Sequence, residues 1–329
     1  MTTTLPGAGA PGAANPDAAR PDADDATRAA TTANGRAARR AARRAAKRGA
    51  TRGGFDQVPK PRAIAVSALL WVFIIGFGFP VLWFVLSAFK PGGELFSYPL
   101  TLFPKQWSVS GFVEAWQSFD FARYFGNTIV VALVTTVLTV FASAATGYAL
   151  AKYDNRWLKV FFVCILATTM LPTEVILAPT FIVIRDLGMY DSLAGIIVPS
   201  IITATGIFMF RQFFLTVPDD LVEAARIDGA SEFGIFFRIM LPISRPIMLT
   251  LAIFSFQWRW NDYIWPLLVL NDPHQFTIQI ALQSIVGAEN VNWTVLLGAS
   301  VISILPLLLI YLVFQKYVNG ADLNAGLKD

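Results

Sequence analysis

The chain has 329 residues, of which 55% are hydrophobic and only 15% are charged. Soluble domains carry about a quarter charged residues, so this composition excludes an ordinary soluble domain and indicates a membrane protein. Twelve of the 26 Lys and Arg residues fall in the first 62 residues, which places the basic excess in a tail and gives no reason to expect nucleic acid as a partner. With one cysteine and one histidine, neither a disulfide framework nor a metal site is expected.

Residues 1–62 form a tail rich in Ala, Arg, Gly, Pro, Asp and Thr. Because they lack the large apolar side chains that offset the entropy of ordering, we expect them to be disordered. Part of the tail carries basic residues at helical spacing, namely Arg36, Arg39, Arg40, Arg43, Arg44, Lys47 and Arg48. A helical stripe of this kind suits an anionic membrane surface, although basic runs are usually solvated tails.

Six apolar stretches follow, and crossing the hydrocarbon layer takes about 20 residues. They lie near 64–89, 126–151, 158–184, 193–214, 246–270 and 293–315. The second contains small residues between Ala142 and Gly147, which let helix backbones approach closely in lipid. Pro172, Glu174 and Pro179 interrupt the third, so its outer part is a candidate for a broken or interfacial helix. The sequence therefore predicts an all-α membrane domain of six spans at 63–329.

The distribution of Lys and Arg predicts the orientation of these spans, because cytoplasmic loops carry the excess. With the N-terminus inside, 21 of these residues lie on the cytoplasmic side and 4 lie outside. Both termini are therefore expected in the cytoplasm, and the larger outside loops are 90–125 and 271–292.

The cytoplasmic segment 215–245, which we call the elbow, has the pattern of two short helices. Pro218, Asp219 and Asp220 are typical of a helix start, with acids at the positive end of the helix dipole. Gly229 is placed to end this helix with a left-handed turn. A second helix is predicted at about 230–240, ending before Pro242. Small residues on one side make this a surface that another protein's groove can approach.

The elbow resembles the signature of the integral-membrane permeases of binding-protein-dependent ABC importers. That signature is Glu-Ala-Ala, three residues, Gly, nine residues, Ile, one residue, Leu-Pro. The matching residues here are Glu223, Ala224, Ala225, Gly229, Ile239, Leu241 and Pro242. A motif match needs its structural context, and a cytoplasmic loop between spans supplies it. The resemblance implies the type I ABC importer permease architecture.

Further segments are similar to the carbohydrate branch of that family, and to its maltose-type second permease in particular. They are Asn127-Thr128, Tyr148 to Ala151, Trp260 to Tyr263, Gln315 to Tyr317, Gly320 and Ala325 to Lys328. The resemblance implies a bacterial inner-membrane subunit that imports a sugar, of the di- or oligosaccharide class. Its implied partners are a second permease in a heterodimer, an ATPase dimer, an extracytoplasmic solute-binding protein and membrane lipid.

The resemblance also implies how the elbow works. No GxxxxGK[ST] sequence occurs, so the chain has no P-loop for ATP; ATP and Mg²⁺ would be used by the partner ATPase, and no cofactor is expected here. The elbow would dock in a cleft of the ATPase, with Glu223, Ala224, Ala225, Asp228 and Gly229 as the coupling contact. Loop 271–292 would reach the binding protein, and residues 320–329 would touch the ATPase dimer.

The fifth stretch carries polar residues, which are costly in a span and mark functional candidates by default. They are Gln257, Arg259, Asn261 and Asp262, and Trp260 lies among them. With Glu174 they are candidates for the translocation path. Arg259 and Asp262 are spaced to pair and are equally consistent with a structural ion pair. Trp258, Trp260 and Trp265 could stack on sugar rings, but such residues more often form an interfacial belt.

Three other functions compete with sugar import. A membrane enzyme would need a nucleophile, a metal or an acid–base set in the bundle, and the sequence supplies no catalytic candidate. A structural membrane protein would need the elbow motif to be coincidental. A permease for a polyamine, glycerol phosphate or another solute stays within the same family.

Overall fold

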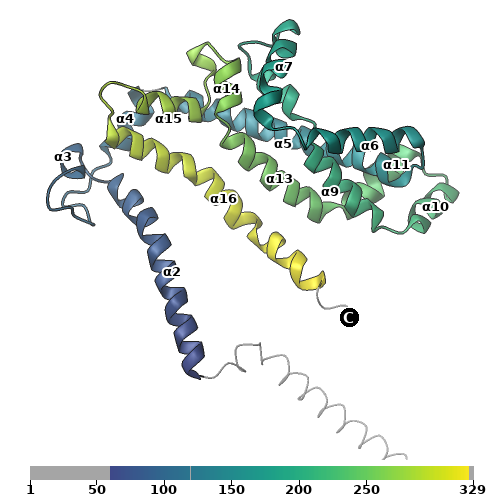
Figure 1. Ribbon diagram of the computed structural model, residues 1–329, viewed down its shortest axis with the longest axis horizontal. Coiled ribbons are helices and arrows are strands. Elements are labelled where there is room, and N and C mark those ends of the chain that lie inside the picture. The colour runs from purple at the N-terminus through teal and green to yellow at the C-terminus, as the bar shows by residue number, and fades with distance from the viewer. Residues whose placement is uncertain (1–59, 119, 326–329) are drawn as a thin grey trace, which may run out of the picture. The chain divides into compact units, whose positions relative to one another are not determined.

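The computed structural model of the chain describes residues 60–118 and 120–325, and every regular element in these ranges is helical (Figure 1). The predicted all-α class is thereby confirmed. The predicted disordered tail at 1–62 lies outside the described residues except for residues 60–62, which begin a helix. The chain divides into two units, Met1–Phe77 and Gly78–Asp329, and helix α2 (Lys60–Ser87) crosses that boundary.

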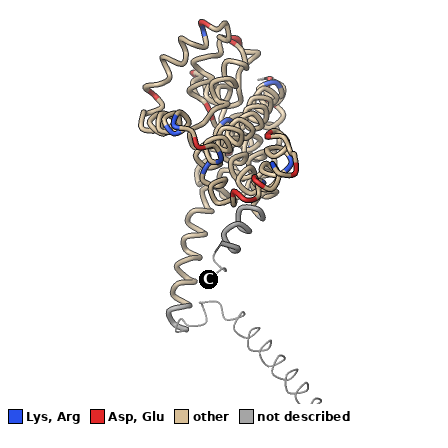
Figure 2. Tube along the Cα trace, turned by 90° about the vertical axis from the view of Figure 1, so that its right-hand side faces the viewer, with Lys and Arg blue, Asp and Glu red and all other residues tan. Residues whose placement is uncertain are grey.

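Four stretches are long and apolar enough to cross a membrane, and two bent helix pairs bring the number to as many as six within the described residues. The four stretches lie in α2, in α5 (Phe121–Lys152), in the segment from α8 (Leu193–Ile197) through η2 (Val198–Ser200) to α9 (Ala204–Leu215), and in α16 (Trp293–Ala325). Figure 2 shows their long uncharged lengths in tan; α5, for example, has no charged residue between Arg123 and Lys152.

The third predicted span is a broken helix. α6 (Arg156–Thr168) and α7 (Thr173–Asp186) meet at an angle of 112°, and Pro172 precedes the first residue of α7. Proline disfavours helical geometry in the residue before it, which accounts for the break. The expectation that Pro179 also interrupts the span is wrong, because α7 continues through it.

The fifth predicted span ends earlier than the sequence suggests. α13 (Arg245–Trp260) stops ten residues before position 270, and the short helix α14 (Ile264–Val269) follows a break. The Asn261 side chain donates to the Gln257 carbonyl at 2.9 Å, which caps the end of α13. Pro266 has no N–H with which to continue a helix to the carbonyl of Asp262. At its other end α13 is bent by 77° from the helices of the elbow.

The elbow contains α10 (Asp219–Ile227), α11 (Glu232–Ile235), the π-helical turn η3 (Phe236–Met240) and α12 (Leu241–Ile243). The prediction that its second helix stops before Pro242 is wrong, since helical structure continues to Ile243. In a regular α-helix the ring of Pro242 would crowd the carbonyl of Arg238. The wider π turn directly before it relieves that crowding.

The opposite end of α5 lies beside three short helical elements. They are α4 (Ser110–Ser118), η4 (Pro273–Gln275) and α15 (Ile278–Val286), of which α4 and α15 are labelled in Figure 1. The short helix α3 (Gly92–Leu95) contacts α16 instead. Phe121 of α5, Ile278 and Ile285 of α15, and Val295 of α16 share one apolar core there. α5 therefore reaches from this core to the elbow.

The predicted close approach of small residues is confirmed where α5 packs against α9. A Cβ atom placed on Gly147 would lie 2.6 Å from the Cβ of Phe210 and 2.9 Å from the backbone nitrogen of Arg211. Gly206 of α9 makes the reciprocal contact, because a Cβ there would lie 2.4 Å from the Ser143 hydroxyl. The two backbones are thus as close as glycine permits.

We expect Gly147→Ala to lower the free energy of unfolding by about 1–3 kcal/mol, the usual cost of overpacking. Gly126→Ala on the same helix is the matched control, since a Cβ there meets nothing within 4 Å. The melting temperatures of both variants in detergent test this. Equal melting temperatures for the two variants would contradict the close crossing.

Candidate functional site

The first helix of the elbow begins and ends as the sequence predicts. Pro218 precedes α10, and Asp219 and Asp220 occupy its first turn. Gly229 has a φ of 79°, which is the left-handed region that favours glycine. The N–H of Ala230 donates to the carbonyl of Ala225, and that of Gly229 donates to the carbonyl of Arg226. These two bonds form a Schellman motif, which fixes the direction in which the chain leaves α10.

The elbow has one side that faces this chain and another that faces away from it. Val222, Ala225, Ile235, Phe236 and Met240 are buried against Tyr148, Phe210 and Phe214. Ile239 and Leu241 pack at the margin of the same core. Glu223, Ala224, Asp228, Gly229 and Pro242 are exposed. Of the two motif alanines, therefore, only Ala224 is available to another protein, whereas Ala225 holds the elbow on its own bundle.

Two polar contacts that the sequence did not indicate tie the elbow to the end of α5. Lys152, the last residue of α5, donates to the Val217 carbonyl and to Asp219, each at 2.6 Å. The Tyr153 hydroxyl donates to Glu232 at 2.6 Å, and Arg226 donates to the same carboxylate at 2.7 Å. Lys152 and Tyr153 lie 65 to 79 residues from their partners in the elbow, and no rule of sequence spacing predicts contacts at such separations.

The charge state of this cluster follows from its contacts. Hydrogen bonds from Arg226 and Tyr153 hold the pKa of the Glu232 carboxyl below its usual range. Burial and the bond to Glu232 raise the pKa of the Tyr153 hydroxyl. Glu232 is therefore ionised and Tyr153 protonated at neutral pH. The contribution of Glu232 to stability is lost in acid, as the pH falls through its lowered pKa, and that of Tyr153 is lost in alkali, as the pH rises through its raised pKa.

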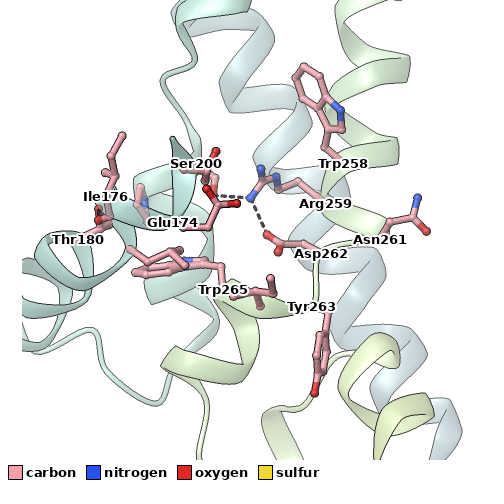
Figure 3. A pocket seen from close by; sticks show the side chains of 14 residues that line it. Glu174, Ile176, Thr180, Ser200, Trp258, Arg259, Asn261, Asp262, Tyr263 and Trp265 are labelled. Carbon is pink, nitrogen blue, oxygen red and sulfur yellow. Dashed lines mark hydrogen bonds and ion pairs between the residues drawn. The ribbon is translucent and has the colours of Figure 1, made fainter. Parts of the chain in front are cut away.

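A cavity of about 650 Å³ lies between α7, η2 and the end of α13 (Figure 3). Its lining is mostly apolar and aromatic with a few polar groups, a composition typical of small-molecule sites. The residues that line it are Thr173, Glu174, Ile176, Leu177, Thr180, Pro199, Ser200, Trp258, Arg259, Asn261, Asp262, Tyr263, Ile264 and Trp265.

The charged groups of the cavity are the ion pair of Arg259 with Asp262 and the carboxylate of Glu174. Arg259 donates from Nη1 to Asp262 and to the Ser200 hydroxyl, both at 2.9 Å, as the dashed lines in Figure 3 show. Among the residues that the structure describes, no side chain forms a hydrogen bond or ion pair with Glu174. With Arg259 and Asp262 compensating one another, the wall carries one net negative charge.

The structure brings together four of the six residues expected to line a path. Glu174 reaches the cavity from α7, while Arg259, Asn261 and Asp262 reach it from the end of α13. Gln257 is exposed outside the cavity lining. Trp260 is 1% exposed and faces the other way, because its Nε1 donates to the Ser303 carbonyl at 2.9 Å.

Two aromatic residues of the wall were seen in the sequence only as belt or stacking candidates. Trp258 is 45% exposed at the cavity. Trp265 is nearly buried, and its Nε1 donates to the Gly195 carbonyl at 3.2 Å. Tyr263 also lines the cavity, although the sequence analysis singled it out only as part of the segment Trp260 to Tyr263. No cluster of three His, Cys, Asp or Glu residues suited to a metal occurs among the described residues.

Residues 143–320 match the family described as binding-protein-dependent transport system inner membrane component. The chain is 37% identical over 268 residues to the arabinooligosaccharides transport system permease protein AraQ of Bacillus subtilis. This match covers 80% of this chain and 95% of AraQ. It is also 34% identical over 266 residues to the sn-glycerol-3-phosphate transport system permease protein UgpE of Pectobacterium atrosepticum. That match covers 78% of this chain and 92% of UgpE.

A solved structure is similar as well. It is the crystal structure of a bacterial ABC transporter involved in the import of the acidic polysaccharide alginate, and one of its chains superposes with a TM-score of 0.73 at 26% identity. The match covers 78% of this chain and 96% of that chain. The structural match therefore covers nearly the same share of this chain as the sequence matches do.

We expect Arg259→Gln and Asp262→Asn each to lower the free energy of unfolding by about 1–3 kcal/mol, since each leaves its partner charge half-buried and unpaired. Their side chains are only 21% and 19% exposed. The double variant should lose less than the sum, because no charge is then left alone. Melting temperatures of the four proteins test this, and additive losses would show that the two residues do not act as a pair.

Proposed function

Because the chain belongs to the family of binding-protein-dependent transport system inner membrane components, which are permease subunits of ABC importers, we propose that it carries an oligosaccharide across the bacterial inner membrane. A subunit of this kind is a multi-pass membrane protein and not an enzyme, and a separate ATPase supplies the energy. Importers of this class also contain a second permease and a solute-binding protein.

The observation that carries the choice of solute is the cavity beside Arg259. Its aromatic side chains Trp258 and Tyr263 offer flat apolar faces, and Glu174 and Asn261 offer acceptors and donors for hydroxyl groups. A sugar has both kinds of surface. The match to an arabinooligosaccharide permease agrees with this chemistry.

The charge of the cavity argues against an anionic solute. The guanidinium of Arg259 is already engaged by Asp262 and Ser200, and Glu174 adds a negative charge. Glycerol phosphate, suggested by the similarity to UgpE, would be repelled by this wall. A polyamine is the second candidate, because the free carboxylate of Glu174 could pair with an ammonium group and aromatic faces attract cations.

We further propose that the exposed side of the elbow is where the ATPase acts. Glu223 and Ala224 project from α10 on the side opposite the buried Val222 and Ala225. Glu223 would pair with a basic residue of the ATPase, and Asp228 and Gly229 would extend the contact. Ala225, Ile239, Leu241 and Pro242 would hold the elbow in place.

This assignment puts the elbow and both termini in the cytoplasm, which agrees with the excess of Lys and Arg there. Loop 271–292 would then face outward toward the solute-binding protein, and residues 320–329 would lie near the ATPase dimer. The second permease would complete a heterodimer around the path, and closure of the ATPase would switch its access from one side to the other.

We expect Glu223→Lys to abolish uptake, because the reversed charge would repel the basic partner while the chain still reaches the membrane. Gly229→Val should also lose most uptake, since a β-branched residue at φ 79° costs about 1–2 kcal/mol. Gly229→Asn is its matched control, as asparagine tolerates left-handed geometry. Lys159→Glu, a charge reversal on an exposed side chain at the start of α6, should import normally.

Uptake, membrane level and co-purification of the ATPase should be measured together for these variants. Normal uptake by Glu223→Lys would refute the assignment of the elbow. Normal uptake by Gly229→Val would show that the exit angle from α10 does not matter.

The solute is tested with cells given a radiolabelled arabinooligosaccharide, spermidine or glycerol 3-phosphate. We expect the wild type to import the oligosaccharide, and Glu174→Gln to reduce this by about threefold to tenfold, because a charged acceptor is exchanged for a neutral one. Asp154→Asn, a change on an exposed side chain outside the cavity lining, is the control. Import of spermidine that disappears in Glu174→Gln would support the second candidate instead, and import of glycerol 3-phosphate alone would refute both.

A further inference from the structure

We propose that α5 carries movement between the elbow and the loop at 271–278, because polar contacts clamp each of its ends to one of these segments. This inference rests on the proposed role of the elbow as the ATPase contact. It assigns positioning roles to Tyr153, Lys152, Asn127 and Thr128, none of which belongs to the elbow motif.

At the elbow end, α5 is attached to α10 at two points. Lys152 holds the beginning of α10 through Asp219 and the Val217 carbonyl. Tyr153 holds its end through Glu232, which in turn binds Arg226 in the last turn of α10. Two points along one helix fix its direction, whereas a single point would leave it free to pivot. A push on Glu223 or Ala224 is therefore transmitted to α5.

At the opposite end, α5 is attached to the loop through its side chains. Asn127 donates from Nδ2 to the carbonyls of His274 and Phe276, each at 3.0 Å. The Thr128 hydroxyl accepts from the N–H of Ile278 at 2.9 Å. Both residues lie in the first turns of α5, so displacement of this end displaces the loop.

The loop has a second attachment, which joins its beginning to the turn between α7 and α8. Asp191, in the turn between α7 and α8, accepts from the N–H groups of Asn271 and Asp272 at 2.8 Å each. These bonds hold the pKa of the Asp191 carboxyl below its usual range, so the attachment persists at neutral pH. Hydrogen bonds thus hold the loop to α5 on one side and to the turn at Asp191 on the other.

Between its two clamps α5 is continuous. Its 32 residues extend about 48 Å at about 1.5 Å per residue. α9 and α13 pack beside it, but their paths are broken at 201–203 and at 261–263. Among the described helices, α5 is therefore the unbroken connection from the elbow to the loop.

The experiment uses the complete transporter, purified with its partner ATPase, and reads the position of the loop. His274→Cys places a reporter in the loop on an exposed side chain whose backbone carbonyl keeps its bond to Asn127. Cys164 is exposed and is replaced by serine. The rate of maleimide labelling is measured before and after ATP with vanadate traps the closed ATPase.

We expect trapping to change the labelling rate of the reporter. Tyr153→Phe removes one hydroxyl at the elbow clamp, and Asn127→Leu removes the amide at the loop clamp. Each should shrink the change by about threefold to tenfold, the equilibrium effect of one lost hydrogen bond, and Asn127→Leu, which removes two bonds, should have the larger effect. The double variant should lose less than the product of the two single losses, because both clamps act on one connection and their effects are coupled. Lys159→Ala, which breaks the surface pair with Asp154 just beyond α5, should leave the change intact.

The other outcomes are decisive as well. The role of α5 would be overturned if trapping left the labelling rate of the reporter unchanged. It would also be overturned if the single variants showed the same change in labelling rate as the wild type. Reduced thermal stability with an unchanged response would show that the clamps are only structural. Loss of the ATPase from Tyr153→Phe would make Tyr153 a docking contact instead. Failure of the wild-type chain to bring down any ATPase would refute the proposed function itself, before the clamps are tested.

Discussion

The close crossing of α5 and α9 is the constraint on which the rest of the structure depends. Gly147 has no side chain, so Phe210 lies directly against the backbone of α5. That approach brings Tyr148, Phe210 and Phe214 together into the apolar surface on which the elbow packs. Apolar burial gives helices in lipid little reason to associate, so close contact between backbones has to supply the attraction. This contact forms the surface on which the elbow lies, and the motif residues Ala225, Ile239 and Leu241 pack onto it.

Hydropathy was sufficient to find the spans but could not show where helices break inside them. Pro172 lies in the break directly before α7, while Pro179 and Pro242 lie within helical structure, because the cost of a proline depends on whether the local turn can widen or lose one bond. The break at 261–263 depends on the side chains of Asn261 and Asp262 folding back on α13. The spacing of Arg259 and Asp262 indicates that they can pair, but it does not indicate that the helix ends there.

The candidate site, too, could be predicted from the sequence only where local rules determine the structure. Local rules gave both ends of α10 correctly, since the acids after Pro218 and the glycine at 229 act through the backbone alone. The expectation that neighbouring polar residues share one surface holds only in part, because successive residues of a helix point about 100° apart. Trp260 thus faces Ser303 while Arg259 faces the cavity. Glu174 joins that cavity only through the 112° bend between α6 and α7.

The single carboxylate of Glu174 makes a physical demand on the cavity. An ionised group without a partner is tolerated in a membrane only where water reaches it, since desolvating it would cost several kcal/mol. Glu174 is exposed, whereas Arg259 and Asp262 are mostly covered and compensate one another. Glu174 therefore requires that water reach this wall of the cavity. On the proposed path, an entering solute would replace that water with groups that bind a carboxylate. The hydroxyl groups of a neutral sugar and the ammonium groups of a polyamine do so, whereas the charge of a phosphate ester would be repelled.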